Sequence, residues 1–355
     1  MKIISLIGNR PQFIKEAILC QEFKKNNINE IIVNSGQHYD YNMADIFFKS
    51  LNINKPKYNL QVGSGKHGEM TGKIMTKFEK VLEIEKPDLV LVYGDTNTTL
   101  AGALVAAKMK IKIAHVESGI RMIPKDMPEE INRVLTDRIS DFLFCPSQKS
   151  IQNLKKEGIT KNVFFTGDVL YDLFLKMKNK FSLNTFKKLK LIPNKYILAT
   201  LHRDYNVDNK EKLEKILKQF NLINKNIPIV FSLHPRTNKR IEDFKLNKYI
   251  KDLIITEPLD YLDLMGLLIN CKSVITDSGG LQKESYFANK SGYILMPDAG
   301  WTELIDNKYN FLCDENNLNN HVSQNYLTPN IKNIYGNGKS GEKILNIILK
   351  KYNEN

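Results

Sequence analysis

The chain has 355 residues, enough for two domains of ordinary size, and its 42% hydrophobic and 26% charged residues are typical of a globular protein. Its formal net charge of +13 comes mostly from lysines that are scattered along the sequence. The sequence contains no basic run with interleaved aromatic residues and no nucleic-acid-binding motif, so the charge does not indicate a nucleic-acid-binding protein.

The first part of the sequence alternates strand-like and helix-like segments. The run at residues 89–93 is almost entirely apolar, as a strand buried on both faces should be. Helices are expected from about residue 13 and over residues 98–109, where small residues dominate. This alternation predicts a parallel sheet with helices on both faces. The predicted strands are residues 3–7, 30–34, 89–93, 113–116 and 142–145.

The same alternation restarts after a lysine-rich linker near residues 176–195. A helix is expected near the end of the chain, over residues 341–350, after a glycine-rich turn. The second half is therefore predicted to be another α/β domain. Its predicted strands are residues 196–201, 229–232, 253–255 and 273–276.

The cysteines and the apolar runs indicate the cellular compartment of the protein. Cys20, Cys145, Cys271 and Cys313 stand far apart, without the spacing of a metal site, and Cys145 and Cys271 lie in or beside apolar runs. We expect buried thiols in a reducing compartment, hence the cytoplasm, and no metal site. The sequence begins directly with a strand, and we find neither a signal peptide nor an apolar run of membrane-spanning length.

Two polar turns, at residues 94–99 and 277–284, each follow a short apolar run and open a helix-like one. Ligand sites of α/β proteins form at such places, where strands end and helices begin. Because the two turns are about half a chain apart, they predict two α/β domains that face each other across a cleft.

The turn after the first strand also carries cations. Arg10 offers a planar fork for phosphate, and Lys15 would lie in the following helical turns. The turn lacks the Gly-x-Gly-x-x-Gly pattern, so a dinucleotide cofactor is not indicated. The alternative is a surface turn with solvated charges.

Three carboxylates are expected near strand ends of the first sheet: Asp95, Glu117 and Glu129. Singly, each could serve as a helix cap or complement a helix dipole. Together they favour proton transfer at carbon, which needs carboxylates on opposite faces of a substrate. His115, taken alone, is more typical of a hydrogen-bonded core residue than of a catalyst.

The second domain contributes cations and hydrogen-bond donors. Histidines follow two of its predicted strands, and the Ser-Gly-Gly turn after a third opens a helix, which makes an anion site. A glutamate in the first turns of that helix could accept both hydroxyls of a ribose. These residues are His202, Arg203, His234, Ser278, Gly279, Gly280 and Glu284.

In this order the motifs resemble the family of non-hydrolysing UDP-N-acetylglucosamine 2-epimerases, over nearly the whole chain. The matching runs include Gly-Asn-Arg-Pro, Gly-Asp-Thr-Asn, His-Val-Glu-Ser-Gly-Ile-Arg, Pro-Glu-Glu-Ile-Asn-Arg and Asp-Ser-Gly-Gly-Leu-Gln. These runs are residues 8–11, 94–97, 115–121, 128–133 and 277–282. Residues 35–38, 200–203 and 335–339 also match the family.

The resemblance implies a GT-B-like α/β fold, with two Rossmann-like domains facing across a cleft, and a homodimer. The last helix of the family crosses back to the first domain. We therefore expect a first domain of residues 1–175 joined by helix 341–355, and a UDP-binding domain of residues 176–340.

The resemblance also implies inversion at C2 of a UDP-sugar, without NAD or an essential metal. UDP leaves C1 as the C2 proton is lost, and it adds back to the resulting 2-acetamidoglucal. By carry-over, the catalytic residues are Asp95, Glu117, Glu129 and His202. The residues expected to bind substrate and UDP are Arg10, Lys15, Arg133, His234, Ser278, Gly279, Gly280 and Glu284. Gln37, His38 and Arg203 resemble a second, activating UDP-sugar site.

The sequence departs from the family pattern at two places. Asn9 and Gln12 replace a threonine and a glutamate, and Trp301 stands where the loop at residues 296–303 usually carries a substrate-contacting arginine. The substrate is expected to be UDP-GlcNAc, interconverted with UDP-ManNAc for surface polysaccharide synthesis. The alternatives are a UDP-2,3-diacetamido-glucuronate 2-epimerase, a hydrolysing epimerase, a GT-B glycosyltransferase and a non-catalytic UDP-sugar-binding protein.

Overall fold

The computed structural model describes residues 1–36, 54–123, 125–298, 300–324, 326 and 333–354. The chain forms two compact units: unit 1 comprises residues 1–176 and 333–355, and unit 2 comprises residues 177–332. The boundaries expected from the sequence were 175/176 and 340/341. Each unit has its own parallel sheet.

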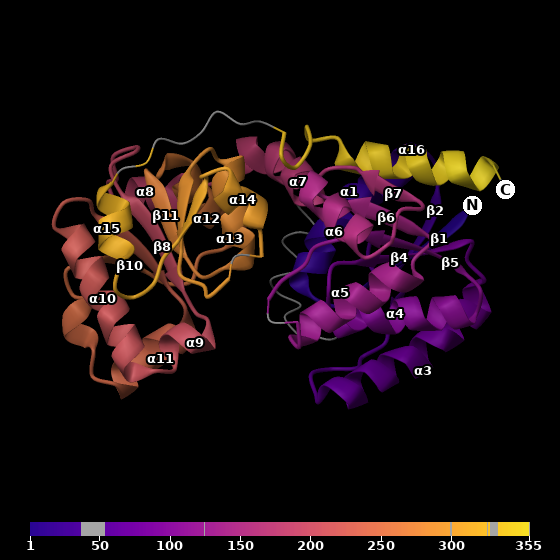
Figure 1. Cartoon of the computed structure of the whole chain (residues 1–355), viewed down its shortest axis with the longest axis horizontal. Coiled ribbons are helices and arrows are strands. Elements are labelled where there is room, and N and C mark those ends of the chain that lie inside the picture. The colour runs from indigo at the N-terminus through magenta and orange to yellow at the C-terminus, as the bar shows by residue number, and fades with distance from the viewer. Residues whose placement is uncertain (37–53, 124, 299, 325, 327–332, 355) are drawn as a thin grey trace. The chain divides into compact units, whose positions relative to one another are not determined.

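Unit 1 is built on a seven-stranded sheet with the order β3-β2-β1-β4-β5-β6-β7, parallel throughout (Figure 1). The strands are β1 (Lys2–Ile7), β2 (Asn29–Asn34), β3 (Tyr58–Asn59), β4 (Leu89–Tyr93), β5 (Lys112–Val116), β6 (Phe142–Cys145) and β7 (Val163–Phe165). The helices are α1 (Arg10–Lys25), α3 (His67–Glu85), α4 (Asn97–Lys108), α5 (Pro128–Ile139), α6 (Gln148–Lys156), α7 (Val169–Met177) and α16 (Ser340–Asn353).

The order of strands in unit 1 reverses between β1 and β4. Successive strands run outward from β1 on one side and from β4 on the other. The helices that follow these two strands cover opposite faces, so the turns after β1 and β4 diverge and leave room for a ligand. This switch point is where a doubly wound sheet binds its substrate.

The core of unit 1 follows from its sequence. Every residue of β4 is buried, and apolar residues of α3 and α4 pack on the sheet. Helices α3, α4 and α5 lie side by side on one face, whereas α16 packs against α1 on the other (Figure 1). Among the described helices, none is long and apolar enough to span a membrane.

Unit 2 repeats the arrangement with a six-stranded parallel sheet, in the order β10-β9-β8-β11-β12-β13. Its strands are β8 (Ile197–Leu201), β9 (Ile229–Leu233), β10 (Ile254–Thr256), β11 (Ser273–Thr276), β12 (Ser291–Ile294) and β13 (Asn310–Leu312). Its helices are α8 (Asn184–Lys188), α9 (Asp204–Val207), α10 (Lys210–Asn224), α11 (Pro235–Asp243), α12 (Tyr261–Asn270), α13 (Gly279–Phe287), α14 (Thr302–Asp306) and α15 (Leu318–Ser323), with 3-10 turns η1 (Lys178–Lys180) and η2 (Asn247–Tyr249). Here the order reverses between β8 and β11.

The α/β class and the two Rossmann-like sheets predicted from the sequence are confirmed. Helix α1 begins at Arg10, three residues before the predicted start, because the Asn9 side chain caps it by accepting from the Gln12 N–H. Strands β3, β7, β12 and β13 were not predicted. Three of them are two or three residues long at or near a sheet edge, and β12 begins with Ser291 and Gly292.

Candidate active site

The turn after β4 forms the centre of the site in unit 1. Thr96 caps α4, and its hydroxyl accepts from the Thr99 N–H. Gly94 has a φ of +64°, and a Cβ there would lie 3.1 Å from the Lys15 Nζ and 3.4 Å from a Glu117 carboxylate oxygen. The turn therefore requires glycine, both for its left-handed backbone and for the close approach of these two side chains.

Asp95 projects from this turn with part of its carboxylate exposed. It is ion-paired with Arg133, which also donates to Glu130 at 2.9 Å. The Asp95 backbone carbonyl accepts from the Asn132 amide at 2.9 Å. Helix α5 thus fixes both the backbone and the side chain of Asp95.

A pocket of about 330 Å³ opens beside the turn, and Asp95 and Glu129 both line it. Glu129 is exposed in the first turn of α5. Asn97 and His67 line it too, and their side chains lie 3.0 Å apart. A hollow with a few convergent polar groups at a switch point is the expected form of a small-molecule site.

Glu117 and Lys15 form a buried ion pair behind the turn. Glu117 follows β5 with a φ of +72°, an uncommon conformation for a residue with a side chain. Such backbone costs on the order of 1 kcal/mol or more and is typical of functional sites. The predicted substrate-binding Lys15 is placed here as the partner of a predicted catalytic carboxylate.

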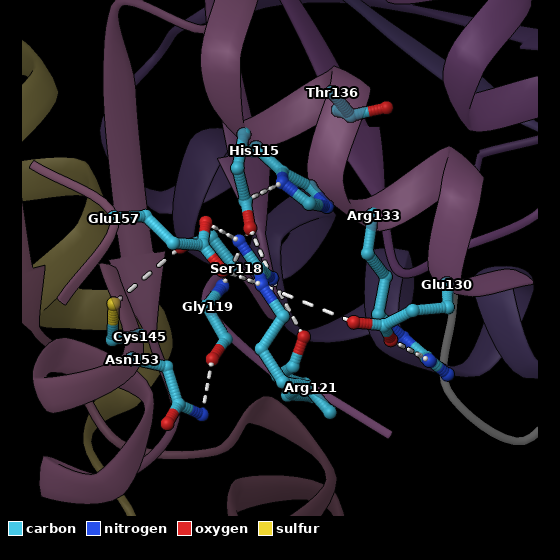
Figure 2. Close-up of polar contacts among 12 residues, drawn as sticks. His115, Ser118, Gly119, Arg121, Glu130, Arg133, Thr136, Cys145, Asn153 and Glu157 are labelled. Atoms are coloured by element: carbon cyan, nitrogen blue, oxygen red, sulfur yellow. Dashed lines mark hydrogen bonds and ion pairs between the residues drawn. The ribbon is translucent and has the colours of Figure 1, made fainter. Parts of the chain in front are cut away.

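A second polar network contacts the backbone of the same turn, and its residues His115, Arg121 and Glu157 are labelled in Figure 2. The two ring nitrogens of His115 lie 2.7 Å from a carboxylate oxygen of Asp137 and 2.8 Å from the Gly94 carbonyl oxygen. Arg121 donates to Asp137 at 2.8 Å and to Glu157 at 2.6 and 2.7 Å. Burial alone would raise the pKa of Asp137, but hydrogen bonds and charge from His115 and Arg121 hold it below the usual value.

In unit 2 the turns after β8 and β11 share one buried carboxylate, Asp277. It accepts from the backbone N–H groups of His202 and Arg203 at 2.9–3.1 Å and from the Asn206 amide at 3.1 Å. The His202 Nδ1 lies 3.0 Å from it. Burial raises the pKa of Asp277, yet His202 and these donors lower it below the usual value. Asp277 thereby orients His202.

His234 follows β9 and lies beside His202, with 5.4 Å between the ring centroids. Partial burial lowers the pKa of His234, and the neighbouring charges of His202 and Arg236 lower it further. The His234 side chain also caps α11 by accepting from the Arg236 N–H at 3.2 Å.

Helix α13 begins at the Ser-Gly-Gly turn. Ser278 caps it, and a Cβ built on Gly279 would meet nothing within 4 Å. The first N–H groups of this helix can therefore approach an anion. Glu284 is half-buried one turn further along.

The loop that departs from the family pattern folds onto this turn. The Trp301 indole donates to the Gly279 carbonyl oxygen at 2.8 Å. The Lys283 Nζ lies 3.9 Å from the centre of the Trp301 rings, which is a cation–π contact. The loop thus packs on the helix start that we expected to bind phosphate.

The structure gathers the predicted residues into two groups, one in each unit. In unit 1, Asp95, Glu117, Glu129, Lys15 and Arg133 surround the turn after β4. In unit 2, His202, His234, Ser278, Gly279, Gly280 and Glu284 follow β8, β9 and β11, and the Arg203 side chain is exposed. The Arg10 side chain, Gln37 and His38 lie outside the described residues.

Sequence reasoning missed the residues that hold these groups in place, Asp137 and Asp277. The signal for Asp277 was available, because it follows a buried strand as Asp95 does. Asp137 had no such signal, since it lies inside α5 and its role depends on His115, 22 residues earlier. No metal site was expected, but one group among the described residues could hold an ion: Glu16, Cys20 and Glu30, within 4.8 Å of one another.

Comparison with known proteins identifies the family. The family model for UDP-N-acetylglucosamine 2-epimerase matches residues 21–349. A UDP-N-acetylglucosamine 2-epimerase homologue of Methanococcus maripaludis is 45% identical over 357 residues, covering 98% of this chain and 99% of the relative. The UDP-2,3-diacetamido-2,3-dideoxy-D-glucuronate 2-epimerase of Pseudomonas aeruginosa is 40% identical over 361 residues, covering 99% and 100%.

Solved structures agree. The UDP-GlcNAc 2-epimerase of Methanocaldococcus jannaschii, in complex with UDP-GlcNAc and UDP, is 42% identical with a TM-score of 0.86, covering 99% of this chain and 100% of that one. The Neisseria meningitidis enzyme bound to UDP-GlcNAc is 30% identical with a TM-score of 0.87, also covering 99% and 100%. The chain belongs to the UDP-N-acetylglucosamine 2-epimerase family and is an isomerase of UDP-sugars.

Proposed function

We propose that the chain interconverts UDP-GlcNAc and UDP-ManNAc, by eliminating UDP to a 2-acetamidoglucal and adding it back. The observation that carries the proposal is the pocket at the switch point of unit 1, which is lined by Asp95 and Glu129. Support also comes from a relative 42% identical to this chain that binds UDP-GlcNAc and UDP.

The chemistry divides between the two units. In elimination the C2–H and C1–O bonds break, the proton passes to a carboxylate, and UDP carries away the electron pair of the C1–O bond. In the return step a carboxylate delivers a proton to the other face of C2, and UDP attacks C1. We assign the proton transfers to Asp95, Glu117 and Glu129. The sugar undergoes no net oxidation or reduction, so the proposed route needs no nicotinamide cofactor.

Departure of UDP requires stabilisation of the negative charge that develops on the diphosphate. We assign this role to Arg10, His202, His234 and the first N–H groups of α13, at Ser278–Gly280. The fixed orientation of His202 by Asp277 supports the assignment, because a preorganised donor loses nothing to reorientation when the charge appears. Glu284 would bind the ribose, and Arg133 would hold Asp95 toward the sugar.

Proton NMR of UDP-GlcNAc in heavy water tests the proposal. We expect the C2 proton to exchange for deuterium and UDP-ManNAc to appear, while free UDP stays far below stoichiometric. The matched pair of variants is Asp95→Asn, which should lose the exchange, and Glu83→Gln on the exposed face of α3, which should keep it. An unexchanged C2 proton in the wild type would overturn the proposal.

The second candidate substrate is a UDP-2,3-diacetamido-glucuronate. It is favoured by the 40% identical relative that bears this name and by Trp301, which stands where the common pattern has an arginine. Parallel reactions with both UDP-sugars separate the two candidates by which C2 proton exchanges. Stoichiometric release of UDP would instead indicate a hydrolysing epimerase.

The predicted homodimer is supported by an apolar stripe on α5. Ile131, Val134 and Leu135 are exposed at helical spacings of three and four residues, so they lie on one face. Light scattering should give twice the chain mass, and Val134→Asp should give the chain mass. A monomeric wild type would contradict this proposal.

The cellular location of the enzyme and its activation at a second UDP-sugar site remain predictions. The four cysteines are free and buried, which supports a cytoplasmic enzyme that makes precursors for surface polysaccharide. The second UDP-sugar site, with Gln37, His38 and Arg203, predicts a sigmoidal dependence of rate on UDP-GlcNAc that Arg203→Ala makes hyperbolic. A hyperbolic wild-type curve would contradict it.

A further inference from the structure

His115 faces a hydrogen-bond acceptor on each side. Its Nε2 lies 2.8 Å from the carbonyl oxygen of Gly94, which can only accept. Its Nδ1 lies 2.7 Å from a carboxylate oxygen of Asp137. Both contacts are buried, and the His115 side chain has no exposed surface.

The carboxyl group of Asp137 is an acceptor as well. Its second oxygen takes hydrogen bonds from the Arg121 guanidinium at 2.8 Å and from the Gly119 N–H at 3.1 Å. These donors stabilise the anion, which has no proton to give His115. Both ring nitrogens must therefore donate, and a histidine with two N–H donors carries a positive charge.

The charges around the ring agree with this assignment. Arg121 pairs with three carboxylates: the buried Asp137 at 2.8 Å, the buried Glu130 at 3.9 Å and the exposed Glu157 at 2.6 Å. Carboxylates therefore outnumber the cation here, and a protonated His115 gives Asp137 a second positive partner. Buried charges are tolerated when they are paired in this way. Of the neighbouring carboxylates, Glu117 is paired with Lys15, and Asp95 shares Arg133 with Glu130.

We propose that His115 is a buried imidazolium, and that it positions the turn carrying Asp95 by donating one N–H to Gly94 while Asp137 holds the other. The effect of His115 on catalysis rests on the proposed function, whereas its protonation state does not. His115 is a positioning residue: it holds the backbone immediately before Asp95 and leaves the proton transfer to the carboxylates.

The protonation state is measured without substrate, by nitrogen-15 NMR of the histidine rings in the full chain. We expect one histidine with both ring nitrogens protonated near neutral pH, as the two acceptors around the ring require. His115→Gln should remove that signal, and His321→Gln should leave it. An unprotonated ring nitrogen on His115 near neutral pH would overturn the proposal.

Kinetics test the positioning role. His115→Gln should lower kcat by about 100-fold, as expected for a displacement of about one ångström, and leave KM within about threefold. Asp137→Asn removes the anion to which the Nδ1–H donates, so the NMR signal of the doubly protonated ring should be lost and the pH profile of kcat should change. A fall in KM and kcat together, or an unchanged pH profile in Asp137→Asn, would indicate a structural role only. An inactive wild type with a doubly protonated His115 would refute the proposed function alone.

Discussion

The two units place an aspartate at nearly the same position and use it in opposite ways. Asp95 follows β4 by two residues and Asp277 follows β11 by one, each beside the switch point of its sheet. The Asp95 side chain is 32% exposed and lines a pocket, whereas the Asp277 side chain is completely buried. A difference of one position after the strand thus distinguishes Asp95, which can contact a substrate, from Asp277, which stabilises the surrounding backbone.

The hydrogen bonds explain the difference. Asp277 is surrounded by donors from the turn after β8, so its charge holds that turn against β11. Asp95 has one cation, Arg133, and receives its positional support through its backbone, from Asn132 and from the Gly94 turn. Carboxylates with few fixed donors remain available for proton transfer.

The largest expected effect is that of Asp95→Asn. It should lower the rate of C2 exchange by about 10²–10⁴-fold, the usual contribution of a general acid or base. The melting temperature should change little, because the carboxylate is partly exposed and its pair with Arg133 contributes modestly. Wild-type activity in this variant would contradict the catalytic role of Asp95, and with it the proposed difference between the two aspartates.

Asp277→Asn should act on stability first. An amide places an N–H₂ group where the carboxylate accepts, which leaves buried donors unpaired at a cost of about 1–3 kcal/mol. We expect a lower urea midpoint and weaker UDP binding by calorimetry, because His202 loses its orientation. Because Asp277 has a lowered pKa, its contribution should be present at neutral pH and be lost as the pH falls through that value. Unchanged stability with a large loss of kcat would instead make Asp277 a direct participant.

Glu16 extends the comparison as a third buried carboxylate, one that faces a second carboxyl group, Glu30, and the Cys20 thiol and has no cation paired with it in the described structure. Burial, and then the nearby Glu30, raise its pKa well above the usual value, and burial also raises that of Glu30. A carboxyl group with a raised folded-state pKa binds more protons in the folded state. The free energy of unfolding should therefore fall as the pH rises from the unfolded value to the folded one.

Glu16→Gln should remove that loss and raise the free energy of unfolding at neutral pH. The matched control is Glu22→Gln on the same helix, whose lowered pKa predicts destabilisation instead. Urea unfolding at about pH 5 and about pH 8 measures both. A Zn²⁺-dependent rise in stability that Cys20→Ser abolishes would mean that a metal ion, not a proton, neutralises the pair.

The sequence predicted the strands and turns that form the two switch points because those signals are local. A buried strand shows as a continuous apolar run, as in residues 89–93, and a helix start shows as a cap such as Thr96 or Ser278. Strand β13 at a sheet edge has only three residues and too little apolar pattern to be found.

The supporting residues of the site could not be predicted in the same way. His115, Asp137 and Arg121 are separated by up to 22 residues, and their contacts exist only after β5 and α5 have packed. The sequence favoured a hydrogen-bonded core histidine, and His115 is buried with a partner at each ring nitrogen, but the sequence could not name those partners. Long-range hydrogen bonds of this kind leave no periodicity in a sequence.

The smallest expected effect concerns Trp301, the residue at which this chain leaves the family pattern. Trp301→Phe keeps an aromatic ring for Lys283 but removes the N–H that donates to Gly279. The loss of one neutral hydrogen bond, about 1 kcal/mol, should weaken UDP binding about fivefold because the start of α13 is less firmly held. Trp301→Ala also loses the cation–π contact with the buried Lys283 and should weaken binding further.

If calorimetry finds UDP affinity unchanged while the preference between the two UDP-sugars shifts, then Trp301 selects the sugar and does not support the phosphate turn. The difference between the two units would then extend to substrate specificity.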